Sequence, residues 1–176
     1  MGRLLFAAIM TALVAVTGAA IADDAMATPY LVAEFQPVGL NVVGLVPEGL
    51  RFDAPARGVI TDGLLAGATM TGIDYVLMRH DGVGIIDARW FVEHPNGVTV
   101  ALTARGYSGE PAPGVIEAMI DPAFVPPDVD IPIHGAIWME TMAPQYAFLN
   151  HTVFGFTGTS NWATGVLRVT ARSLAP

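Results

Sequence analysis

The stretch GIDYVLMRHDGVGIIDARWFVEHPNGVTVALTARGY, residues 72–107, decides the fold of this chain. It contains three segments in which apolar and polar residues alternate, as in strands with one buried face: 72–79, 83–93 and 98–107. Between them lie His80-Asp81-Gly82 and His94-Pro95-Asn96-Gly97, and the Asp-Gly pair predicts a tight hairpin turn of a primed type. We therefore expect three consecutive antiparallel strands, a meander.

The rest of the chain continues this pattern. Gly and Pro interrupt it about every eight to twelve residues, which is typical of a β-sandwich or a β-barrel. Residues 51–57 are expected to be irregular, because Pro55 argues against a central strand. Two short helices are expected, one over 115–120 and one over 144–150 that begins at its proline. The remaining strands are expected at 30–38, 40–46, 59–61, 131–141, 153–157 and 165–171.

Residues 1–22 have the features of a signal peptide. Arg3 is followed by an apolar stretch over residues 4–16, and Ala20-Ile21-Ala22 forms a small-x-small cleavage pattern. The alternative is a membrane anchor, since this stretch is nearly long enough to span a bilayer. The cleavage pattern favours removal. We expect a periplasmic or secreted protein with no membrane contact after cleavage, in which residues 23–57 and 58–176 form one domain.

The composition excludes many functions. The chain has 8 basic residues, all arginine, against 16 acidic residues, so its net charge is −8. An acidic surface repels phosphate backbones, which makes nucleic acid an improbable partner. Without lysine there is no Schiff base, and without cysteine there is no thiol nucleophile or thiolate metal site. No histidine pair has helical metal-ligand spacing, and we expect neither a metal nor a cofactor.

Alternation places the polar residues of three strands on one face each. That face carries Asp87 and Arg89 on the second strand of the meander, Arg105 and Tyr107 on the third, and His134, Trp138 and Glu140 on the strand at 131–141. In one interpretation this face is exposed to solvent, with Asp87 and Arg89 as a surface ion pair. In the other it lines the mouth or lumen of a barrel and orients a small ligand.

Several short motifs then occur in an order and spacing that resemble the family catalogued as domain of unknown function 3237. They are Gly72-Ile73-Asp74-Tyr75, Asp81-Gly82, Asp87-Ala88-Arg89, Arg105-Gly106, Glu140-Thr141 and Tyr146-Ala147-Phe148-Leu149-Asn150. The resemblance runs from about residue 58 to 170. It implies an all-β fold, a single antiparallel barrel of broadly calycin-like type that often forms oligomers. His134 stands where this family usually has an arginine, and many relatives lack a signal peptide.

The resemblance favours the lumen interpretation and carries over Asp74, Tyr146 and Asn150 as further ligand-binding residues. We expect an exported barrel that binds a small organic ligand, with Arg89 and Arg105 recognising a carboxylate, enolate or phenolate by forked hydrogen bonds. The alternative is an isomerase, cyclase or lyase in which Asp87, His134 or Glu140 transfers protons. A third possibility is a structural role without a ligand. The chain is also compatible with a homo-oligomer.

Overall fold

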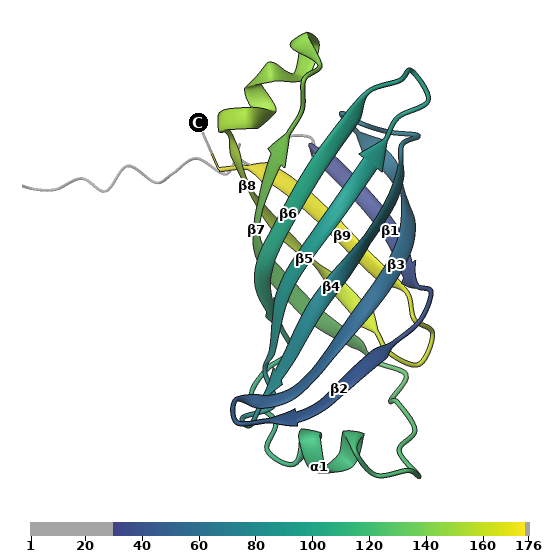
Figure 1. Cartoon of the computed structure of the whole chain (residues 1–176), viewed down its shortest axis with the longest axis vertical. Coiled ribbons are helices and arrows are strands. Elements are labelled where there is room, and N and C mark those ends of the chain that lie inside the picture. Colours follow the sequence, from purple (N-terminus) through teal and green to yellow (C-terminus); the bar gives the residue numbers. More distant parts are fainter. Residues whose placement is uncertain (1–29, 175–176) are drawn as a thin grey trace, which may run out of the picture.

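The computed structural model describes residues 30–174, in which nine strands form one antiparallel sheet (Figure 1). The strand order is β1-β9-β8-β7-β6-β5-β4-β3-β2, and β1 also pairs with β3. All strands except β2 therefore close into an eight-stranded barrel, which confirms the expected fold class. The bounds are β1 Leu31–Pro37, β2 Asn41–Val46, β3 Gly49–Gly63, β4 Thr69–Arg79, β5 Gly84–Glu93, β6 Thr99–Ser108, β7 Asp130–Glu140, β8 Val153–Asn161 and β9 Leu167–Ser173. The predicted signal peptide, residues 1–22, lies outside the described residues.

The two predicted helices are present and short. Helix α1 covers Val115–Met119, and the 3-10 helix η2 covers Pro144–His151 with its proline in the first turn. They lie at opposite ends of the barrel, α1 beside β2 and η2 beside the start of β8 (Figure 1). No helix in the described part of the chain is long and apolar enough to cross a membrane.

The expectation that residues 51–57 are irregular is wrong, because they belong to the 15-residue strand β3. On one edge β3 pairs with β4 along its length, including Pro55 with Ile73. On the other edge it pairs first with β2, up to Asp53, and then with β1, from Ala56 onward. Pro55 lies between these two partners, and its carbonyl accepts a hydrogen bond from the Val38 N–H. At this position no partner strand requires a backbone N–H from residue 55. A proline is therefore tolerated within this strand.

The meander over residues 72–107 is confirmed, but its first turn is not of a primed type. Arg79 donates to the Val83 carbonyl at 2.9 Å and Gly82 donates to the Arg79 carbonyl at 2.9 Å, which leaves three residues in the loop. Gly82 has a φ of 87°, whereas no residue other than glycine has a positive φ in the described chain. Asp81 is therefore not left-handed, and the loop is a three-residue hairpin with glycine in the left-handed position.

The core occupies the end of the barrel that carries η2. Its most buried large side chains include Phe154, Ile60, Leu65, Leu149 and Val92. The opposite end is covered by α1, whose Ile116 packs against Leu50 and Met78. The segment that carries α1 is fixed to the barrel where Ala112 donates to the Asp81 carbonyl at 2.8 Å. One end of the barrel is thus filled by side chains, and the other is partly covered by a separate segment.

Two glycines with the same backbone conformation test the attachment of this segment. Gly82 and Gly97 have φ values of 87° and 86°, but a Cβ on Gly82 would lie 2.4 Å from the Ala112 carbonyl oxygen, and one on Gly97 would meet nothing within 4 Å. We expect Gly97→Ala to cost about 1–2 kcal/mol from left-handed strain. Gly82→Ala should cost at least about 1 kcal/mol more, because the added methyl overlaps Ala112. Urea unfolding of both variants measures this difference, and equal losses would contradict the described packing.

Candidate functional site

The barrel encloses a cavity of about 690 Å³ that runs from the middle of the lumen to the end under α1. Its wall is built from the inward-facing side chains of the strands and is almost entirely apolar, with Trp90 among the largest. Near α1 it is completed by Met119, Phe124 and Trp162. Among the described residues that line it, Asp74 is the one ionisable side chain. A cavity of this size and composition is typical of small-molecule sites.

The space around Asp74 exists because its neighbours across the sheet are small. Asp74 pairs with Ala54 on β3 and with Ala88 on β5, and Ala88 pairs in turn with Ala104 on β6. All three alanines line the cavity. Side chains at directly paired positions point to the same face of a sheet, so this row of alanines leaves the lumen open beside one carboxyl group.

Asp74 interrupts the pairing of β4 with β5. The pairing goes from Asp74–Ala88 to Leu77–Ile85, and the Asp87 backbone N–H between them donates to Asp74 Oδ1 at 3.1 Å. Burial raises the pKa of Asp74 to about 6, the hydrogen bond from Asp87 opposes that rise, and the nearby Asp87 charge adds to it. Asp74 therefore changes its charge near neutral pH inside an apolar cavity, which is a frequent property of functional carboxyl groups.

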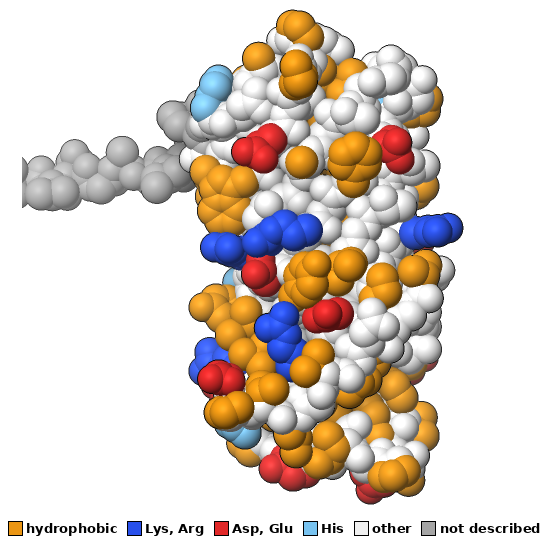
Figure 2. Space-filling model, viewed as in Figure 1, with side chains coloured by type: hydrophobic (Ala, Val, Ile, Leu, Met, Phe, Trp, Pro, Cys, Tyr) orange, Lys and Arg blue, Asp and Glu red, His pale blue; other side chains and the backbone are white. Residues whose placement is uncertain are grey.

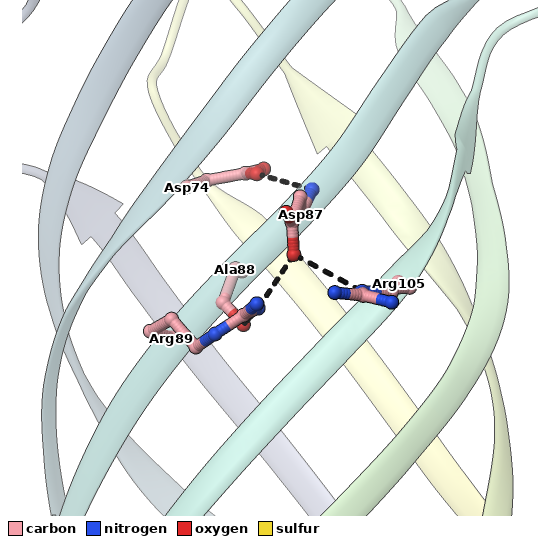
Figure 3. A network of polar contacts seen from close by, with 5 residues as sticks. All are labelled: Asp74, Asp87, Ala88, Arg89 and Arg105. Carbon is pink, nitrogen blue, oxygen red and sulfur yellow. Dashed lines mark hydrogen bonds and ion pairs between the residues drawn. The ribbon is translucent and has the colours of Figure 1, made fainter.

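The Asp87 side chain lies on the outer face of the same wall (Figure 3). Its Oδ1 accepts hydrogen bonds from Arg89 Nη1 at 2.5 Å and from Arg105 Nε at 3.3 Å. Burial alone would raise the pKa of Asp87, but the hydrogen bonds and charges of the two arginines lower it overall. The side chains of Asp87, Arg89 and Arg105 are 40%, 45% and 62% exposed, so each pair contributes about 0–1 kcal/mol to stability.

These positions overturn the expectation that the polar strand faces line the lumen. The alternation of faces is confirmed, but Asp87, Arg89 and Arg105 point outward, and no arginine lines the cavity among the residues described. The physical reason is that the opposite faces of β5 and β6 are almost wholly apolar, with Ser108 as the polar exception, and occupy the interior. Tyr107, His134, Trp138 and Glu140 are also on the outer face. Of the ten predicted site residues, Asp74 alone lines the cavity.

Some of the outward residues nevertheless come together. A second hollow, of about 520 Å³, lies on the outer wall and is lined in part by Arg89, Arg105, Trp138, Glu140 and Asn150. Tyr107 and His134 form a separate pair on neighbouring strands, with ring centroids 6.1 Å apart.

Two of the predicted ligand-binding residues have structural contacts of their own. Asn150 Oδ1 accepts from the Thr141 N–H at 2.7 Å, and Asn150 Nδ2 donates to the Thr141 carbonyl at 3.0 Å. This amide thus joins the end of η2 to the residue that follows β7. Tyr146 is partly buried and packs against the main core. Their contacts account for both residues without a ligand.

No pattern in the sequence indicated the residues at the open end of the cavity, such as Asn161 and Trp162. Asn161 Nδ2 donates to Asp128 Oδ1 at 2.9 Å and to Asp130 Oδ1 at 3.2 Å, which ties the segment after α1 to the turn between β8 and β9. For Asp74 the sequence did contain an indication of its place in the cavity. Asp74 is the one charged residue on the inward face of β4, between Met70 and Met78. Within residues 30–174, no three potential metal ligands lie together.

The pKa of Asp74 predicts how stability depends on pH. Because the folded pKa of about 6 exceeds the ordinary value of 3.8, the stabilising contribution is complete below 3.8 and is lost as the pH rises through 6. The loss amounts to about 3 kcal/mol. Asp74→Asn keeps an oxygen acceptor for Asp87 but cannot ionise.

Urea unfolding should therefore show Asp74→Asn gaining stability over the wild type as the pH increases, by about 3 kcal/mol between roughly pH 4 and pH 8. A difference between the two proteins that stays constant with pH would contradict this assignment.

Solved structures resemble this barrel. A β-barrel-like protein from Acinetobacter baumannii AYE has a TM-score of 0.62 and 21% identity, over 82% of this chain and 92% of the other. A protein of unknown function from Clostridium acetobutylicum ATCC 824 has a TM-score of 0.68 and 19% identity, over 83% and 96%. A conserved protein of unknown function from Rhodopseudomonas palustris has a TM-score of 0.62 and 18% identity, over 83% and 95%. At these identities the likeness establishes the fold alone.

Comparison with curated proteins finds no match. The family model described as protein of unknown function DUF3237 matches residues 34–170, from β1 to β9, and this range includes the cavity wall around Asp74 and the outer ion-pair cluster. The chain therefore belongs to the DUF3237 family of proteins of unknown function.

Proposed function

We propose that this protein binds a small, largely apolar molecule inside the barrel, with Asp74 as its polar anchor. The observation that carries the proposal is the cavity of about 690 Å³ with a single carboxyl group in an apolar wall. A site of this kind obtains affinity from apolar burial and orientation from a few polar groups. The segment with α1 lies over the open end and would cover part of a bound ligand.

The environment of Asp74 defines the ligand chemistry. Above about pH 6 the Asp74 side chain is a carboxylate, which accepts a hydrogen bond from a hydroxyl group and repels an anion. A carboxylate ligand, which we expected from the two arginines, therefore has no cationic partner among the described residues that line the lumen. The favoured ligand is neutral, with an apolar body and one hydrogen-bond donor.

The second candidate is an enzyme on the same barrel, with Asp74 rather than Asp87, His134 or Glu140 transferring the proton. It is favoured by the pKa of Asp74, about 6, in a water-poor cavity, because a general acid–base works best with a pKa near the working pH. The two functions differ in the effect of Asp74→Asn. An enzyme loses turnover while it still binds ligand, whereas a binding protein has no turnover to lose.

Binding can be tested with 1-decanol and decanoate, which share a ten-carbon chain length and differ in charge. The three tryptophans are separate reporters in NMR spectra of the indole N–H groups, because Trp90 and Trp162 line the cavity and Trp138 lies on the outer wall. At about pH 8 we expect decanol to shift the Trp90 and Trp162 signals and to bind at least about tenfold more tightly than decanoate. Asp74→Asn should reduce the preference for decanol over decanoate.

Ala54→Phe serves as the matched variant, because it places a ring in the lumen beside Asp74 and leaves the outer wall unchanged. Decanol should no longer shift Trp90 in this variant. The proposal is overturned if decanol leaves both cavity tryptophans unshifted in the wild type, or if Ala54→Phe, correctly folded, binds decanol as well as the wild type does.

Export is part of the proposal and rests on residues 1–22. Expressed with its full sequence in a Gram-negative host, the protein should be recovered from the periplasm with Asp23 as its first residue. Mass analysis of the intact protein measures this directly. Recovery of a membrane-bound form that retains Met1 would instead support the anchor.

A further inference from the structure

The hollow on the outer wall is built from four neighbouring strands, β5 to β8, and the end of η2, and it does not share a lining residue with the lumen cavity. Arg89 on β5 pairs with Thr103 on β6, and Thr103 pairs with Trp138 on β7, so these side chains form one row across the wall. Ala101 and Thr103 are small, and larger side chains surround them. The result is a groove of about 520 Å³, on a surface where basic and acidic side chains gather (Figure 2).

The basic side of the groove carries a guanidinium group that has one carboxylate partner and free hydrogen-bond donors. Arg105 donates to Asp87 through Nε at 3.3 Å, and among residues 30–174 its two terminal nitrogens have no hydrogen-bond partner. Asp87 is shared with Arg89, so two positive charges are balanced by one negative charge. A guanidinium with free terminal nitrogens matches the two oxygens of a carboxylate.

The other sides of the groove define which kind of carboxylate ligand would fit. Trp138 is 42% exposed and offers an apolar ring face on β7, with Thr103 between it and Arg89 in the same row. Glu140, which pairs with Ala101, brings a negative charge to the end away from Arg105. A flat apolar body fits against the tryptophan, and a second anionic group would be repelled by Glu140.

We infer that this outer groove is a second ligand site, which binds small aromatic monocarboxylates through Arg105 and Arg89 with the ring against Trp138. This site is independent of the proposed lumen function. Its charge preference is opposite, because the groove attracts an anion and Asp74 repels one. The two sites can therefore be distinguished with one pair of ligands.

The test uses 2-naphthoate and its neutral analogue 2-naphthamide. In indole NMR spectra of the wild type at about pH 8 and low salt, 2-naphthoate should shift the Trp138 signal and leave Trp90 and Trp162 unchanged. The amide should bind the groove at least about tenfold more weakly. If 2-naphthoate leaves Trp138 unshifted, the groove is not a site. Shifts of Trp90 and Trp162 with 2-naphthoate would also contradict the charge preference proposed for the lumen, whereas no shift of any tryptophan leaves the lumen proposal unaffected.

Arg168→Gln is the matched control for Arg105→Gln. Arg168 also donates through Nε to a carboxylate, Glu34, at 3.1 Å, and its side chain is 60% exposed, but it lies on β9 away from the groove. Both substitutions remove one positive charge. Arg105→Gln should weaken 2-naphthoate binding about tenfold or more, and Arg168→Gln by less than about twofold.

A second variant, Thr103→Phe, fills the groove from its floor without removing a charge and should also abolish the Trp138 shift. Equal weakening by the two arginine substitutions would show general attraction of anions to the surface. That result, or full binding by Thr103→Phe, would overturn the inference.

Discussion

The pairing of β1 with β3 is the constraint on which the rest of the structure depends. It converts an open sheet into a closed barrel, and closure separates the two faces of every strand into an interior and an exterior. Closure also requires β3 to change partners from β2 to β1, which takes place around Pro55. Once the barrel is closed, a side chain that points inward is removed from bulk water. The raised pKa of Asp74 is a direct consequence.

The wall between the two candidate sites is a single sheet, and Asp87 contributes to both of its faces. Its backbone N–H donates to Asp74 in the lumen, and its carboxylate binds Arg89 and Arg105 outside. The inner contact lies in an apolar environment and is weakly screened, whereas the outer ion pairs are exposed to water and salt. Asp87 therefore lies beside Asp74, whose pKa is raised, while the two arginines outside lower the pKa of Asp87 itself.

The two hollows have opposite chemistry for a physical reason. The lumen excludes arginine because an unpaired buried guanidinium would be costly, and it contains one acid that is neutral over much of the acidic pH range. The outer groove contains arginines because water and Asp87 solvate and balance them there. The two ligands that we propose, a neutral apolar molecule inside and an aromatic anion outside, are based on this division.

The sequence by itself determined most of the strands, the meander, the short helices and the two-faced character of β5, β6 and β7, but not the length of β3. Each of these rests on local alternation or on turn residues, which a single stretch of chain contains. Only the tertiary structure decided that Arg89 and Arg105 face outward and that Asp74 lies in an open cavity. The cavity depends on Ala54, Ala88 and Ala104 standing beside Asp74 across four strands. That alignment is a matter of register between strands, and the volume it leaves depends on side chains distant in sequence, so no local pattern contains it.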